Sequence, residues 1–284
     1  MAREAGAGSL KLALCFAAAV FLAGSVLADE APGNRTTVNG YLGPPTPRTC
    51  YWTEREFKDL PERGPASASG ILLWNHGQWT GHPSWQYGAP PVIRLFAEAG
   101  WDVVLVQRNP DCDGSWSAKG GEYVGNLVKE VRAAKERGYR RVLVAGQSIG
   151  AGIALGAASK TRQIDGVLAF ALSHGRATCR NPRTFRPDMI AFHERHIGRA
   201  IQESQAPRVL ISMGKDDHCV GHSFSPLVSS SLAAKDVAYI YLDESTAIAG
   251  HGAATGGEFA SRYGDCVLKF FAREDRLDHG RHSC

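Results

Sequence analysis

Short, almost continuous apolar runs recur along the chain and alternate with longer segments in which apolar residues return at helical spacing. Runs that lack a polar face are typical of strands buried on both faces. We therefore predict strands at Gly70 to Trp74, Trp101 to Val106, Arg141 to Ala145, Gly166 to Leu172, Arg208 to Ser212 and Val237 to Leu242. The segments between them predict helices at Pro91 to Ala99, Glu122 to Arg137 and Ala151 to Lys160, and a further helix follows the last strand at Glu258 to Arg273.

This alternation defines the expected architecture. Helices that connect successive buried strands form βαβ units, and such units build a parallel sheet. The predicted fold class is α/β, with a mostly parallel, open sheet and helices on both faces. No internal repeat or interior linker is evident, so residues 48–284 are expected to form one domain. The longest insertion lies between the strands near residues 173 and 208, where a small cap is expected.

Composition narrows the class of protein. The chain has 284 residues, of which 44% are hydrophobic and 21% charged, and these values exclude a disordered chain. The formal net charge is +4, from 32 basic and 28 acidic residues without a block of one sign. A balanced surface of this kind does not favour a nucleic-acid partner.

The N-terminal segment has the pattern of a signal peptide. Arg3 and Lys11 precede an apolar run from Leu12 to Leu27, and the small residue Ala28 follows. The alternative is a membrane anchor, but a run of about 16 residues is short of the roughly 20 that a spanning helix needs. We expect cleavage after Ala28, an extended leader over residues 29–47, and a secreted or periplasmic protein without a membrane span.

The sharpest chemical signal is the pentapeptide from Gly146 to Gly150, of the form Gly-x-Ser-x-Gly. It lies between a predicted strand and a helix rich in small residues. A serine at such a turn is held in strained backbone geometry beside the amino end of a helix. Ser148 is therefore a candidate nucleophile. The alternative is a glycine-rich turn in which Ser148 only caps the helix.

A serine hydroxyl needs a base, and the base needs an acid that orients it. In parallel α/β sheets these groups collect beyond the carboxyl ends of the strands. His251 follows the last predicted strand and is the candidate base. Asp217 and its neighbour Asp216 both follow the strand that ends at Ser212, and we favour Asp217 as the acid.

With these residues the chain resembles the α/β-hydrolase superfamily, nearest to small single-domain esterases and dienelactone-hydrolase-like enzymes. The resemblance covers about Gly70 to Arg273. It rests on Gly146-Gln147-Ser148-Ile149-Gly150, on Gly214-Lys215-Asp216-Asp217 with Val220, on Gly250-His251, and on Asn75-His76-Gly77. Dienelactone hydrolases proper have a cysteine nucleophile, so their lactone substrate is not implied.

The resemblance implies that Ser148 is the nucleophile, Asp217 the acid and His251 the base. It also implies an oxyanion hole formed by the N–H groups of Ile149 and Gln78. No metal ion or organic cofactor is needed for this chemistry. The expected activity is hydrolysis of a small-molecule carboxylic ester. The alternatives are a peptidase or amidase with the same triad, or a binding protein that kept the fold without catalysis.

Aromatic residues in the predicted loops could line an apolar substrate pocket. Packing beneath long loops is an equally good explanation for them. The candidates are Trp79, Trp85, Tyr87 and Trp116.

The cysteines agree with export to an oxidising compartment. Without Cys15, an even number remains and none is in a CxxC motif, which argues against a zinc or redox site. Some could instead be buried thiols. Chain order suggests the pairs Cys179 with Cys219, Cys266 with Cys284, and Cys50 with Cys112.

Overall fold

A computed structural model of the chain describes residues 51–54, 57, 59–77, 88–108, 116–172, 187–219, 224–246 and 248–284. All of them belong to one compact unit, Asn34–Cys284. The predicted signal peptide and leader lie outside the described residues. None of the helices in the described part of the chain is both long and apolar enough to cross a membrane.

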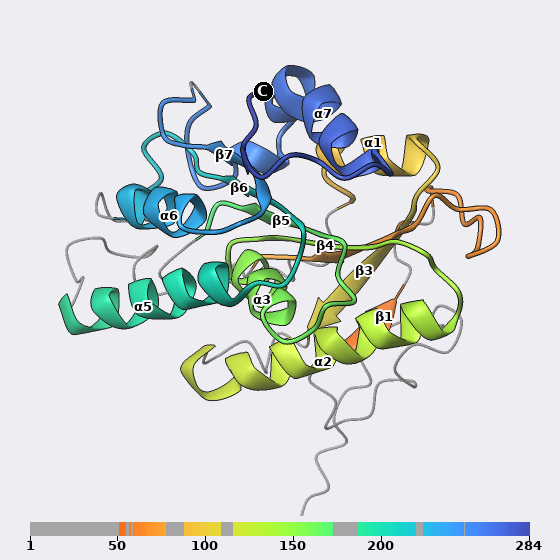
Figure 1. The fold of residues 1–284 in the computed structure, drawn as a ribbon, viewed down its shortest axis with the longest axis horizontal. Helices are drawn as coiled ribbons and strands as arrows, with labels where there is room; N and C mark the ends of the chain where they lie inside the picture. The colour runs from red at the N-terminus through yellow and green to blue at the C-terminus, as the bar shows by residue number, and fades with distance from the viewer. Residues whose placement is uncertain are drawn as a thin grey trace, which may run out of the picture. The chain divides into compact units, whose positions relative to one another are not determined.

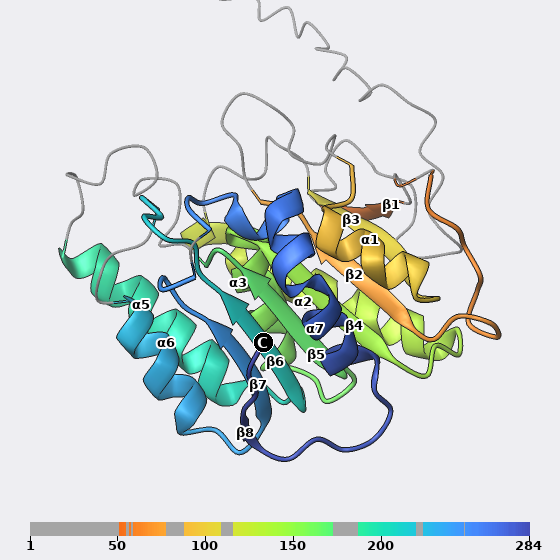
Figure 2. The same cartoon turned by 90° about the horizontal axis from the view of Figure 1, so that it is seen from above.

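The centre of the unit is a single sheet with the strand order β1-β3-β2-β4-β5-β6-β7-β8. Every neighbouring pair is parallel except β1 and β3, which are antiparallel. Figure 2 shows the central strands side by side. The strands are β1 (Tyr51–Glu54), β2 (Ile71–Asn75), β3 (Asp102–Arg108), β4 (Val142–Gln147), β5 (Gly166–Phe170), β6 (Arg208–Ser212), β7 (Ala238–Leu242) and β8 (Gly280–Arg281).

Helices cover both faces of this sheet. In Figure 1, α1 and α7 lie above it, and α2 and α3 lie below. The helices are α1 (Pro91–Glu98), α2 (Trp116–Glu136), α3 (Ile149–Ala158), α5 (Pro187–Glu203), α6 (Phe224–Ala233) and α7 (Gly257–Ala272), with the 3-10 turn η5 (Ala253–Thr255). The predicted α/β class, with a mostly parallel sheet and helices on both faces, is confirmed.

Strand β4 explains why the runs are continuously apolar. Its residues alternate between two cores because successive side chains point to opposite faces of a sheet. Val142 and Val144 pack in the core that contains residues of α2, α3, α5 and α6. Leu143 and Ala145 pack in the core on the side of α1 and α7. These four residues are fully buried, so none of these positions faces solvent, where a polar residue would be expected.

Three features differ from the sequence prediction. Trp116 was expected in a loop, but it is the first residue of α2. The edge strands β1 and β8 were not predicted, because four and two residues are too short for a periodic pattern. The expected cap is wrong for residues 187–203, which form α5 against α3 and α6, with Ile197 and Ile201 in the core. Residues 173–186 lie outside the described part of the chain.

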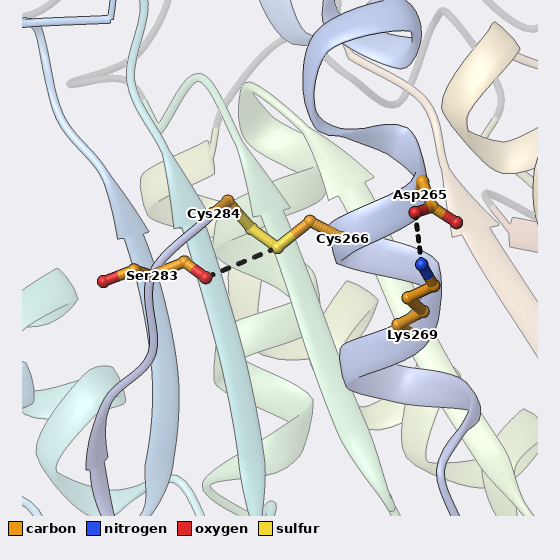
Figure 3. The surroundings of a disulfide bond; sticks show 5 residues. All are labelled: Asp265, Cys266, Lys269, Ser283 and Cys284. Atoms are coloured by element: carbon orange, nitrogen blue, oxygen red, sulfur yellow. Dashed lines mark hydrogen bonds and ion pairs between the residues drawn. A yellow bond between two sulfur atoms is a disulfide. The ribbon is translucent and has the colours of Figure 1, made fainter.

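The C-terminal tail closes one edge of the sheet. Gly280 and Arg281 form β8 beside β7, and the backbone N–H of His282 donates to the carbonyl of Tyr239 (2.8 Å). A disulfide then joins Cys284 to Cys266 of α7 (Figure 3), as the chain order suggested.

Candidate active site

Ser148 occupies a sharp turn between β4 and α3. Its φ of 57° and ψ of −120° are strained for a residue with a side chain. The two flanking glycines allow the turn to be this tight. A Cβ on Gly146 would lie 2.3 Å from the backbone of Gly150, and a Cβ on Gly150 would lie 2.1 Å from the carbonyl oxygen of Asn75. The pentapeptide therefore brings strand, helix and the end of β2 together around one serine.

The surroundings of Ser148 are fixed by backbone hydrogen bonds. The Ser148 N–H donates to the carbonyl of Phe170 at the end of β5 (2.9 Å). The Asn75 side chain donates to the carbonyl of Ala145 in β4 (3.2 Å). These bonds hold the carboxyl ends of β2, β4 and β5 beside one another.

The predicted oxyanion donors are only partly described. Ile149 is the first residue of α3, and the first N–H groups of a helix have no acceptor within the helix. Its position is therefore suited to bind a developing negative charge. Gln78 lies outside the described residues. His76 is buried in the turn before it, with Nδ1 2.7 Å from the carbonyl oxygen of Gly77.

The candidate acid and the candidate base come from two loops that run alongside each other. The Lys215 N–H donates to the carbonyl of Ile248 (2.9 Å), and the Gly250 N–H donates to the carbonyl of Lys215 (2.7 Å). A Cβ on Gly214 would lie 2.2 Å from the carbonyl oxygen of Gly250, so a larger residue would push the loops apart. Gly250 itself has a φ of +89°, a conformation that glycine adopts readily.

This pairing brings Asp217 to His251. The Nδ1 of His251 lies 2.8 Å from Oδ2 and 3.0 Å from Oδ1 of Asp217. The Asp217 side chain is only 2% exposed and that of His251 18%. Asp217 Oδ1 also accepts the backbone N–H of Cys219 (2.8 Å), which fixes the carboxylate. Asp216, the alternative acid, is exposed and has a φ of +54°. Of the two aspartates, the structure thus joins Asp217 to the histidine.

His251 is also tied to the residue before Ser148. The Gln147 side-chain amide donates to the carbonyl oxygen of His251 (3.1 Å), across 104 positions of sequence. The Nε2 of His251 is buried and has no hydrogen-bond partner among the described residues, Ser148 included. A contact between base and nucleophile often shortens only when substrate binds. The structure therefore gives an oriented imidazole next to the serine turn, with one nitrogen available.

The acid loop contains the sole group of described residues with metal-ligand spacing. Asp217, His218 and Cys219 have ligand atoms within 4.8 Å of one another. Cys219 is in a disulfide, so its sulfur is not a thiolate ligand, and Asp217 already binds His251. These residues do not fit a metal ion. Cys179, the suggested partner of Cys219, lies outside the described residues.

Most of the predicted pocket residues are not among the residues that the structure describes. Trp79, Trp85 and Tyr87 lie outside the described residues, and Trp116 begins α2. One site residue was missed by the sequence analysis. Gln147 occupies a variable position of the Gly-x-Ser-x-Gly motif, and nothing in the sequence indicates its contact with His251.

Comparisons with known proteins agree on the fold. No protein-family model and no curated protein matches the sequence. Solved structures do match, with low identity. A puromycin-hydrolyzing peptidase from Mycobacterium tuberculosis has a TM-score of 0.57 and 16% identity over 81% of this chain and 39% of that one. An esterase from Pyrococcus furiosus has a TM-score of 0.53 and 16% identity over 78% of this chain and 87% of that one.

A third match is dipeptidyl peptidase 4 from Porphyromonas gingivalis, with a TM-score of 0.52 and 15% identity over 78% of this chain and 33% of that one. This chain thus spans about two fifths of the M. tuberculosis peptidase (39%). The chain has the α/β-hydrolase fold, and its structural neighbours are esterases and peptidases of that fold.

Proposed function

We propose that the chain is an exported serine hydrolase that cleaves carboxylic esters through Ser148, His251 and Asp217. The observation that carries the proposal is the contact between Asp217 and His251, which Gln147 links to the turn that holds Ser148. A strained serine at a strand-to-helix turn and an imidazole oriented by a carboxylate are the parts that acyl transfer needs.

Each group has a defined role in the proposed reaction. His251 Nε2 takes the proton of Ser148 as Oγ bonds to the ester carbonyl carbon. Asp217 holds the imidazole in the required tautomer and stabilises the imidazolium. The carbonyl oxygen becomes an oxyanion that the Ile149 N–H stabilises, with Gln78 as the second donor. His251 then protonates the leaving alcohol, and a water that it activates releases the acid from the acyl-enzyme.

Two disulfide-bonded regions support the export part of the proposal. Cys266 is joined to Cys284, and Cys219 is also in a disulfide. Disulfides persist in oxidising compartments and are rare in the cytosol. A mature chain that begins at Asp29 in the exported fraction is the check, and an uncleaved chain retained in the cytosol would contradict it.

Labelling with a fluorophosphonate probe tests the catalytic part. The wild-type chain should be labelled covalently, and Ser148→Ala should abolish labelling because the nucleophilic oxygen is gone. Ser159→Ala is the matched control, since Ser159 follows the far end of α3 and donates to Gly156 (2.8 Å). An unlabelled wild-type chain would favour a binding protein. Matched aryl esters and aryl amides then separate the enzyme classes, and faster amide turnover would favour a peptidase or amidase.

A further inference from the structure

We infer that Gln147 is a positioning residue for the proposed nucleophile. It holds two segments around Ser148: the loop of residues 248–256, called the histidine loop, and the turn after β2, formed by His76 and Gly77. The inference rests on the proposed function and deepens it. Gln147 is the last residue of β4, immediately before Ser148. Its position therefore cannot shift without moving the serine.

The first half of the inference is the contact with the histidine loop. Gln147 Nε2 donates to the carbonyl oxygen of His251 (3.1 Å). A carbonyl oxygen only accepts hydrogen bonds, so the nitrogen of the amide must face His251 and its oxygen must face away. One side chain thus links the backbone of the proposed base to the backbone of the proposed nucleophile.

The second half is the contact with the turn after β2. A Cβ on Gly77 would lie 2.1 Å from the side-chain oxygen Oε1 of Gln147 and 3.3 Å from the main-chain carbonyl oxygen of the same residue. The amide oxygen is therefore in contact with the backbone of Gly77. This turn leads directly to Gln78, the proposed second oxyanion donor. The two ends of one amide touch the two segments that must converge on Ser148.

The histidine loop needs such a tether because its backbone is permissive. His251 stands between Gly250 and Gly252, and glycine restricts the backbone least of all residues. The Asp217 carboxylate orients the ring through Nδ1, but it does not hold the main chain of the histidine. The Gly250 N–H ties the loop to Lys215, on the side of the aspartate. The Gln147 hydrogen bond ties the backbone of His251 itself to the serine turn, and it therefore sets the distance between the ring and that turn.

The test compares variants by the rate of phosphonate labelling at Ser148. Gln147→Met keeps the length of the side chain but removes the donor. We expect the labelling rate at saturating probe to fall about tenfold, because misplacement of a catalytic group slows chemistry. The half-saturating probe concentration should change little. Gln147→Glu should be slower still, because its carboxylate would face the carbonyl oxygen of His251.

Gln205→Met is the matched control. The Gln205 amide also donates to a backbone carbonyl, that of Ser159, at the same distance of 3.1 Å. If Gln147 were merely structural, both variants would lower thermal stability and neither would change the labelling rate at a temperature where each is folded. A Gln147→Met variant that is labelled at the wild-type rate would overturn the inference.

Hydrogen exchange keeps this test separate from the proposed function. Gln147→Met should speed amide exchange in residues 248–256, whereas Gln205→Met should not. If Ser148 is not labelled in the wild type, the proposed function fails, yet faster exchange in that loop still supports the tether. If the wild type is labelled, and Gln147→Met has the same amide exchange and the same labelling rate, the proposed hydrolase function is supported and the positioning role of Gln147 is contradicted.

Discussion

The two ends of the parallel sheet use buried polar residues in opposite ways. At the amino ends of the strands, buried carboxylates and guanidinium groups bind backbone groups of neighbouring segments. At the carboxyl ends, a serine is held in strained geometry and a buried imidazole nitrogen has no partner among the described residues. The first arrangement lowers the free energy of the fold, whereas the second places the groups that the proposed reaction uses.

Asp102, the first residue of β3, is the centre of the amino end. Its side chain accepts the backbone N–H groups of Arg63 (2.7 Å) and Gly64 (2.8 Å) and the hydroxyl of Tyr139 (2.6 Å). It is buried, as Asp217 is. The two aspartates differ in what they bind, because Asp102 joins segments whereas Asp217 orients an imidazole.

Two arginines at the same end cap helix α7. Arg208 donates to the carbonyls of Phe270 (3.0 Å) and Arg273 (2.6 Å), and Arg141 donates to that of Ala272 (2.7 Å). These acceptors have no partner within the helix, and a cation beside them also complements the helix dipole. Burial lowers the pKa of both arginines, but guanidinium groups remain protonated at ordinary pH.

The largest effect is expected from a substitution that disturbs only the carboxyl ends of the strands. Asp217→Asn should lower ester turnover about 10⁴-fold, because the amide no longer favours the tautomer that leaves Nε2 free to accept a proton. Stability should change little, since the side-chain oxygen that accepts the Cys219 N–H is retained. Steady-state kinetics and thermal unfolding measure the two quantities. Asp216→Asn is the control and should retain wild-type turnover; a comparable loss there would move the acid role away from Asp217.

The next largest effect is expected from a substitution that disturbs only the amino ends of the strands. Asp102→Ala should lower the free energy of unfolding by about 3 kcal/mol, because it leaves two backbone donors and a buried hydroxyl without their acceptor. Turnover per folded molecule should not change. Denaturant unfolding and active-site titration give the two values. Asp102→Asn keeps one acceptor oxygen and should lose less, and a parallel fall in specific turnover would show that the two ends are coupled.

The smallest effect is expected from a comparison that measures the backbone strain at Ser148. Ser148→Gly and Ser148→Ala both lack the hydroxyl, and only glycine adopts a positive φ without cost. The glycine variant should be more stable than the alanine variant by about 1 kcal/mol. Thermal unfolding of the two inactive variants compares them directly. Equal stabilities would mean that the turn at Ser148 stores no strain.

Much of the fold was predictable because burial leaves a periodic signature. The central strands were found within a few residues of their observed bounds, and β6 was found with its exact limits, Arg208–Ser212. The edge strands were missed because two or four residues have too little pattern to detect. The cap was wrong for α5 because the apolar positions of an amphipathic helix do not say which surface it covers. Ile197 and Ile201 pack in the core beneath the sheet.

The sequence by itself determined the fold class, the serine turn and the order of the candidate residues. These features depend on the spacing of apolar and small residues that are neighbours in the chain. Only the tertiary structure decided that Asp217 rather than Asp216 meets His251, since adjacent residues of one loop differ in direction rather than in type. It alone revealed Gln147, whose contact with His251 spans 104 positions. Contacts between distant segments depend on the order in which the strands lie side by side in the sheet, and no local sequence pattern predicts that order.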